Sequence, residues 1–159
     1  MKNILIYTIT LFSFIYSHCQ VPCGIFDDIH RIVEIDEHIK TINKSISNII
    51  SLSNEKEDSQ NMNQLIRWIN TKEDHSNKIQ NLVSEYFLAQ RIKPLEKNET
   101  DYDRYVELTT VCHKIIYLSM KLKQNVDSEI TIQLKNNINL LVDMYFNDGQ
   151  KRHLKVHRN

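Results

Sequence analysis

The sequence predicts an all-α protein, folded as an up-down four-helix bundle. Four stretches of the chain place apolar residues at the spacing of an α-helix. The 159 residues include only two Gly and two Pro, which are too few breakers for a turn-rich β-sandwich or a linker array. The connections between the four stretches are short, which favours antiparallel packing of consecutive helices. A chain of this length also fits a single domain.

The first 17 residues have the pattern of a secretory signal peptide. Lys2 provides a positive charge, residues 4–16 are mostly apolar, and the small residue Ser17 ends the segment. As a helix, the apolar part would span only about 20 Å, which is short of the ~30 Å hydrocarbon core of a bilayer. We therefore expect cleavage after Ser17 and no stable membrane anchor. The mature protein would be secreted or periplasmic, in an oxidising compartment.

Cleavage after Ser17 would expose metal-binding groups in residues 18–26. The mature chain would begin at His18, whose free α-amine has a pKa of about 8 and can lose its proton near neutral pH. The amide nitrogen of Cys19 and the thiolates of Cys19 and Cys23 complete a set of two nitrogens and two sulfurs. A planar set of this kind suits Ni(II) or Cu(II), whereas zinc prefers a tetrahedron. The thiolates would also make a trivalent metal accessible, with the His18 imidazole as an axial ligand.

The start of this predicted mature chain, HCQVPCG, resembles the nickel hook of the nickel-containing superoxide dismutase family. That hook reads His-Cys-x-x-Pro-Cys-Gly and directly follows a processing site. Glu34 falls where the family has a glutamate that holds the axial histidine. Residues 85–87 (EYF) and 104–108 (RYVEL) resemble the end of the family's second helix and the opening of its third. The resemblance therefore spans most of the mature chain.

The resemblance implies a nickel enzyme that converts superoxide to dioxygen and hydrogen peroxide while the metal cycles between the +2 and +3 states. His18, Cys19 and Cys23 would be both the nickel ligands and the catalytic residues. Glu34 would orient the imidazole of His18, as outer carboxylates commonly do for metal-bound histidines. The resemblance also implies that the bundles assemble into a homohexamer.

Three positions depart from the family pattern. Phe26 stands where the family usually has a tyrosine, so the ring beside the path of superoxide is kept and its hydroxyl is lost. Gln20 stands in place of an aspartate, which removes a negative charge near the metal. The family's arginine that pairs with the glutamate has no clear counterpart. Counting back from residues 86–87 gives Lys72 as the candidate for that cationic role.

The predicted bundle occupies residues 27–149, with helices at about residues 27–53, 60–90, 101–124 and 128–147. Asp27 or Asp28 can cap the first helix, since a carboxylate there accepts hydrogen bonds from free backbone amides. Pro94 ends the second helix because proline disfavours helix at the preceding residue. Gly149 is expected to stop the fourth helix, and residues 150–159 to form a mobile basic tail.

The charge pattern argues against a nucleic-acid partner. The chain has 20 Lys and Arg residues against 20 Asp and Glu residues, so its formal net charge is zero. The basic residues of the tail have no aromatic platform beside them on which bases could stack. The partners that the resemblance implies are superoxide and further copies of the same chain.

Alternative interpretations of the cysteines stay open. Cys19 and Cys23 could form a disulfide, the common outcome for paired cysteines in an exported chain. Cys112 lies on an apolar helix face and is expected to be a buried small hydrophobe rather than a ligand. The chain could thus also be an exported helical protein that binds a metal at its N-terminus without dismutase activity.

The histidines outside residues 18–26 do not predict a second metal site. His30, Glu34 and His38 follow one another at four-residue spacing on one helix face. The two histidines are about 12 Å apart along the helix axis, too far to share one ion. His75 lies among charged residues and is expected to face solvent or a neighbouring subunit.

Overall fold

Helices account for most of the chain that the structure describes, residues 26–55 and 58–158. In this computed structural model those residues contain no strand, so the all-α prediction is confirmed. None of the helices in these two ranges is both long enough and apolar enough to cross a bilayer. The elements in chain order are α2 (Asp28–Ser53), α3 (Ser59–Asn81), the π-helix η1 (Leu82–Arg91), α4 (Tyr102–Gln124), α5 (Glu129–Tyr145) and α6 (Asp148–Arg158).

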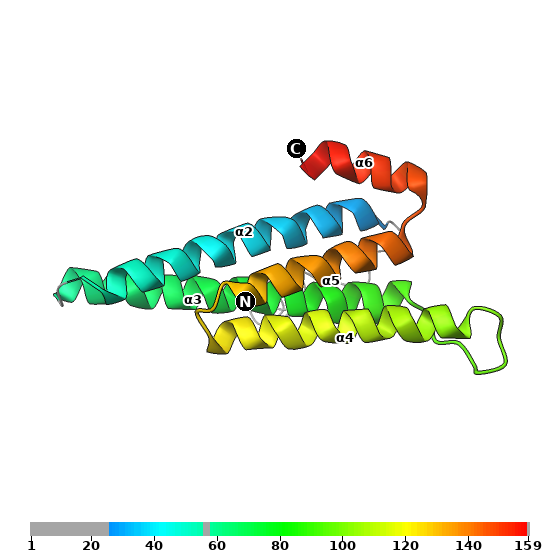
Figure 1. The fold of residues 1–159 in the computed structure, drawn as a ribbon, viewed down its shortest axis with the longest axis horizontal. Helices are drawn as coiled ribbons and strands as arrows, with labels where there is room; N and C mark the ends of the chain where they lie inside the picture. Colours follow the sequence, from blue (N-terminus) through cyan, green and yellow to red (C-terminus); the bar gives the residue numbers. More distant parts are fainter. Residues whose placement is uncertain (1–25, 56–57, 159) are drawn as a thin grey trace, which may run out of the picture.

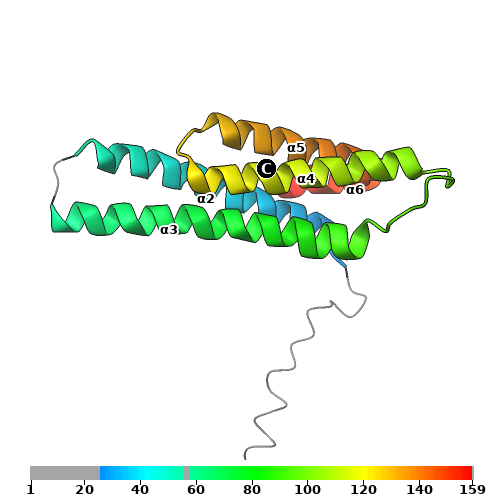
Figure 2. The same ribbon diagram turned by 90° about the horizontal axis from the view of Figure 1, so that it is seen from below.

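Four long helices form the bundle, and consecutive ones run in opposite directions (Figures 1 and 2). Helix α2 packs against α3 and α5, and α4 packs against the same two helices, which closes a four-membered ring. Helix α6 packs on the outer side of α2 (Figure 1). The start of α2 and the end of α5 lie at the same end of the bundle, so this arrangement gathers side chains from both helices next to Phe26.

The core consists of the apolar stripes from which the helices were predicted. Isoleucines are most of the core residues that α2 contributes, and Ile32, Ile35 and Ile42 are fully buried. They join fully buried residues from the other helices, among them Phe87, Ile115, Leu134, Ile138 and Leu141. Burial of such side chains stabilises a fold by roughly 1.5–3 kcal/mol each. Packing thus outweighs the low helix propensity of isoleucine.

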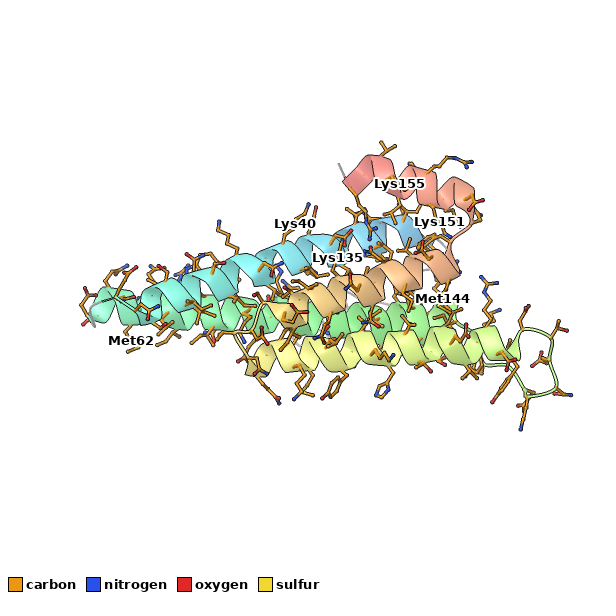
Figure 3. All side chains as sticks on the ribbon, viewed as in Figure 1. Lys40, Met62, Lys135, Met144, Lys151 and Lys155 are labelled. Carbon is orange, nitrogen blue, oxygen red and sulfur yellow. The ribbon has the colours of Figure 1, made fainter. Side chains whose placement is uncertain are left out.

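The α2–α3 hairpin extends beyond the ends of α4 and α5 (Figures 1 and 2). Three large apolar residues of this projecting end are about half exposed, namely Ile50, Met62 and Ile66. Figure 3 shows Met62 there, near the start of α3. Ile50 and Ile66 belong to the apolar stripes from which these helices are predicted, yet they are half exposed within the monomer, because α4 and α5 are too short to cover this end.

The C-terminal segment is a helix and not the mobile tail that the sequence predicted. Gly149 lies inside α6, so it does not stop a helix at this point. Helix α6 is held at two places: Leu154 is buried, and Arg158 donates to Asp36 of α2 at 2.6 Å. Asp36 is itself buried and also pairs with Lys135 of α5. A buried carboxylate needs charged partners, and it therefore orders a segment that composition alone describes as a basic tail.

The predicted second helix changes its geometry at Leu82. Hydrogen bonds in η1 join residues five apart, as between the amide of Ile92 and the carbonyl of Phe87, at 2.8 Å. In an α-helix two residues five apart would point about 140° away from each other. The wider π-helix turn brings such residues to the same side. Tyr86 and Arg91, five residues apart, consequently both reach α2.

Lys72 has a different role from the one that the sequence predicted. Its side chain is buried, and Nζ donates to the carbonyls of Leu122, Lys123 and Asn125, at 2.5, 2.8 and 3.0 Å. These acceptors lie at the end of α4, where helix carbonyls lack partners within the helix. Lys72 makes no ion pair with Glu34, so its assignment as the cationic partner of that glutamate is wrong. It instead fastens α3 to the end of α4.

We predict that replacing Lys72 with Met lowers the free energy of unfolding by about 1–3 kcal/mol, because three buried carbonyls lose their donor. Urea denaturation followed by circular dichroism measures this change. The matched control is Lys40→Met on α2, since Lys40 is exposed and extends into solvent (Figure 3). Equal stability of the two variants would contradict the capping role of Lys72.

Candidate metal centre

The first turn of α2 sets the geometry of the region after the predicted metal ligands. Asp27 is the N-cap, and its Oδ1 accepts from the amide of His30 at 2.9 Å. This confirms one of the two predicted caps and fixes where the helix begins. The predicted nickel ligands His18, Cys19 and Cys23 lie outside the described residues, as do the predicted signal peptide and Gln20. The described part of this region begins at Phe26 and continues along the surface of α2.

Asp28, the other predicted cap, has a different function. Its side chain is only 8% exposed and accepts hydrogen bonds from three residues. Arg91 approaches both carboxylate oxygens, with Nε at 2.8 Å and Nη2 at 2.7 Å. The hydroxyls of Tyr86 and Tyr145 donate at 2.7 and 2.9 Å. One carboxylate therefore joins α2, η1 and α5 at the end of the bundle where Phe26 lies.

The protonation states in this cluster depend on its partners. Burial alone would raise the pKa of Asp28, but the hydrogen bonds from Arg91, Tyr86 and Tyr145 outweigh it and hold the pKa below its ordinary value. Burial raises the pKa of Tyr145 to about 12, and the hydrogen bond to Asp28 acts in the same direction. At neutral pH the carboxylate is thus ionised, both hydroxyls keep their protons, and the charge of Arg91 is compensated.

Phe26, predicted to lie beside the path of superoxide, packs on this cluster. Its ring faces the guanidinium of Arg91, whose central carbon is 4.3 Å from the ring centroid. The edge of Tyr86 approaches on another side, with the two ring centroids 5.9 Å apart. The ring remains 37% exposed. Phe26 is thus held by two neighbours and still presents part of its surface to solvent.

Glu34 lies two turns further along α2 and is paired with an arginine. Nη1 of Arg31 donates to Oε2 of Glu34 at 2.7 Å, and both side chains are about one-third exposed. The guanidinium of Arg31 also lies over the ring of Tyr86, 5.5 Å from its centroid. Within the described residues Oε1 of Glu34 accepts no hydrogen bond. Arg31 is therefore the cationic partner of Glu34, for which the sequence predicted Lys72.

An open groove of about 320 Å³ runs beside this pair. It lies between α2 and the α3–η1 segment, and its lining includes Arg31, Glu34, Lys78, Glu85, Tyr86 and Gln90. Oε1 of Gln90 is buried and has no hydrogen-bond partner among the described residues. The groove combines apolar surface with charges of both signs, so it suits a peptide segment that carries both apolar and polar groups.

The histidines form a pair that the sequence did not predict. His38 of α2 and His75 of α3 place their Nδ1 atoms 3.1 Å apart, so His75 does not simply face solvent. Burial lowers the pKa of both imidazoles, and in His38 the neighbouring His75 adds to the shift. The described residues contain no group of three or more His, Cys, Asp or Glu side chains placed to hold a metal ion. His30, Glu34 and His38 do not form such a group.

Cys112 is fully buried in α4, as the sequence predicted, and it is a free thiol. Burial raises the pKa of its thiol to about 12. A thiol that stays protonated at neutral pH is a poor metal ligand, because the thiolate is the form that binds. Cys112 is part of the core.

The sequence-based predictions missed Arg31 and Arg91. The first carried a usable signal, since Arg31 precedes Glu34 by three residues and such pairs are neighbours on a helix surface. The second carried none, because Arg91 reaches Asp28 only through the π-helix geometry of η1.

A comparison with protein families bears directly on this helical scaffold. The model of the family described as nickel-containing superoxide dismutase matches residues 14–149. The chain therefore belongs to the nickel-containing superoxide dismutase family. It is accordingly a superoxide dismutase, an oxidoreductase whose cofactor is nickel. Comparisons with curated proteins and with solved structures gave no significant match.

We predict that the depressed pKa of Asp28 makes part of the folding stability depend on pH. The unfolded state binds its proton near pH 3.8, the ordinary value, while the folded state resists protonation to lower pH. The contribution of Asp28 is thus complete above that pH and is lost as the pH falls through the folded-state pKa. The stability advantage of wild type over Asp28→Asn should be largest above about pH 4 and shrink below it.

Urea denaturation at a series of pH values measures this difference. Asp143→Asn is the control, because Asp143 is largely exposed and its ion pair with Lys151 is 3.9 Å long. Exposed pairs of this kind contribute little. A difference between wild type and Asp28→Asn that did not change with pH would contradict the prediction.

Proposed function

We propose that the catalytic nickel site forms at residues 18–26 after cleavage behind Ser17. The α-amine and imidazole of His18, the amide nitrogen of Cys19 and the thiolates of Cys19 and Cys23 would hold the metal. Nickel in such a site supplies one-electron chemistry between its +2 and +3 states. Two superoxide anions and two protons are thereby converted to one dioxygen and one hydrogen peroxide. The donor set fits the metal, because thiolates and deprotonated nitrogens suit planar nickel.

The length of the chain allows residues 18–26 to fold back so that His18 reaches Glu34. Eight residues separate His18 from Phe26, and an extended chain of that length reaches at most about 28 Å. Glu34 lies eight residues beyond Phe26 on α2, which is about 12 Å along the helix. The segment is therefore long enough to fold back beside α2. The groove next to Glu34 offers a place for it to bind, with charged side chains in the lining and with Gln90 as a buried acceptor that has no partner among the described residues.

The Arg31–Glu34 pair is the observation that carries this proposal. Arg31 holds one oxygen of the Glu34 carboxylate, and the other is left to accept a hydrogen bond from the imidazole of His18. A carboxylate held in this way orients the ring and increases its strength as a ligand. Glu34 thus acts through His18, and Arg31 acts through Glu34.

Phe26 and Gln20 shape the approach of superoxide. Phe26 is apolar, partly exposed and fixed between Arg91 and Tyr86, so it restricts the space near the metal without giving a proton. Gln20 adds no negative charge that would repel the anion. The protons for hydrogen peroxide would come from solvent, and backbone amides near Gln20 and Cys23 would help to shape the approach of the anion.

Export and assembly belong to the same proposal. The signal peptide at residues 1–17 would direct the chain to a secreted or periplasmic location, and its removal would create the amine on which the site depends. The mature bundles would assemble into a homohexamer, in which neighbouring subunits cover the metal-binding segment. The half-exposed apolar end of the α2–α3 hairpin is available for such contacts.

We predict that Cys19→Ser or Cys23→Ser abolishes turnover, because loss of a thiolate removes access to trivalent nickel. The decay of superoxide after pulse radiolysis gives the rate, and metal analysis gives the nickel content. Cys112→Ala is the matched control, since Cys112 is buried in α4 and takes no part in the site. Full activity in either serine variant would refute the assignment of these two thiolates as nickel ligands.

We predict that Glu34→Gln keeps the nickel content but lowers the turnover rate by about tenfold or more, in line with the loss of an outer partner of a metal-bound histidine. Glu37→Gln is the control, because Glu37 is exposed on the same helix and contacts neither Arg31 nor the groove. The nickel content and the superoxide decay rate are measured on the same samples. An unchanged rate in Glu34→Gln would show that Glu34 does not orient the imidazole.

A further inference from the structure

Phe26 is where the segment with the predicted metal ligands joins the described helical body. Its ring lies on the guanidinium of Arg91, 4.3 Å from the ring centroid, and against the edge of Tyr86. A cation over an aromatic face is attracted to the electrons of the ring, and the attraction is stronger when the pair is shielded from water. Cys23 is three residues before Phe26, so the chain keeps the two within about 10 Å. The position of Phe26 therefore limits where Cys23 can lie.

Arg91 is itself held rigidly. Two of its nitrogens bind both oxygens of Asp28, at 2.8 and 2.7 Å, in the bidentate geometry that only a guanidinium provides. Asp28 is fixed in turn by the hydroxyls of Tyr86 and Tyr145. The plane of the guanidinium, and with it the surface on which Phe26 rests, is thus set by three helical elements.

The charge of Arg91 does not serve to attract superoxide. A buried carboxylate compensates it at hydrogen-bond distance, so little net field reaches solvent. The stacking surface, and not the charge, is what Arg91 offers to Phe26.

We propose that Arg91 is a positioning residue: held by Asp28, it clamps Phe26 and so fixes the base of the nickel-binding segment. The inference rests on the proposed function, because it takes Cys23 as a nickel ligand. Rigid attachment at Phe26 reduces the entropy that the segment loses when it closes around the metal. Arg91 and Phe26 should therefore act on nickel affinity as one unit.

The test is a double-mutant cycle on the processed protein that begins at His18. Nickel dissociation constants are measured for wild type, Arg91→Met, Phe26→Leu and the double variant. Each single change should weaken nickel binding by about threefold to tenfold, and the double variant should be no weaker than the worse single. Phe26→Tyr keeps the ring and should bind nickel like wild type. Independent, multiplying effects of the two changes, or no effect of either, would overturn the clamp.

Loss of stability is separated from loss of positioning by two further variants. Arg158→Met breaks the corresponding ion pair with the buried Asp36, far from Phe26 along α2. It should lower the free energy of unfolding and leave the nickel dissociation constant unchanged. Arg91→Lys keeps a charge for Asp28 but loses the planar surface, so it should recover stability better than nickel affinity. If nickel affinity instead changed in parallel with the free energy of unfolding in both variants, the role of Arg91 would be purely structural and the proposal would be overturned.

A readout without metal distinguishes this inference from the proposed function. The ring current of Phe26 should shift the side-chain protons of Arg91 upfield in wild type, and Phe26→Leu should abolish the shift. If the processed wild type bound no nickel, the proposed function would fail, and this measurement would still decide whether the clamp exists. Identical Arg91 resonances in the two proteins would overturn it.

Discussion

The carboxylate of Asp28 is the interaction on which this end of the molecule depends. It is almost fully buried, and four hydrogen bonds from Arg91, Tyr86 and Tyr145 satisfy it. Removing an ion from water costs several kcal/mol, and that cost is recovered only when geometry and hydrogen bonding are nearly complete. The three elements that supply the donors are therefore held in one relative position. An apolar side chain in place of Asp28 would be stabilised by burial, but it would not fix the three elements relative to one another.

Buried charges recur at the other helix junctions. Asp36, two turns from Asp28, binds Lys135 of α5 and Arg158 of α6, and Lys72 of α3 satisfies three carbonyls at the end of α4. Isoleucine packing is non-directional and tolerates several ways of sliding one helix along another. Each polar junction is satisfied in only one arrangement. Apolar burial thus provides the stability of the bundle, and these junctions favour one register of its helices.

Two acidic residues near the start of α2 show how partner number separates structure from function. Each carboxylate oxygen of Asp28 already accepts two hydrogen bonds within the bundle, so Asp28 has no capacity for another ligand. Glu34 has one partner in Arg31, about one-third exposure and an oxygen that accepts nothing from the described residues. A residue that serves the nickel site must keep such capacity. The same residue chemistry therefore gives a structural anchor at one position and a candidate for orienting His18 at the other.

Helix positions followed from the sequence to within a few residues, because apolar spacing reports helices directly and Asp27 marks the start of α2. The family could also be inferred, since the HCQVPCG motif is local in sequence. Partnerships across the fold could not. The pairing of His38 with His75 and the binding of Lys72 to α4 join residues 37 or more positions apart. Counting along the chain consequently gave Lys72 for a role that Arg31 fills.

The sequence by itself determined the helical class and the core-facing residues of most helices, and it predicts a set of metal-binding groups, because these depend on residue chemistry and short-range spacing. Only the tertiary structure decided that residues 82–91 widen into a π-helix, that residues 148–158 form a helix on α2, and that Asp28 is buried against Arg91, Tyr86 and Tyr145 rather than capping a helix. Each of these depends on a charged or aromatic partner supplied by a distant helix. The energy of a buried ion pair cannot be read from one stretch of sequence, since it arises only when both partners leave water together.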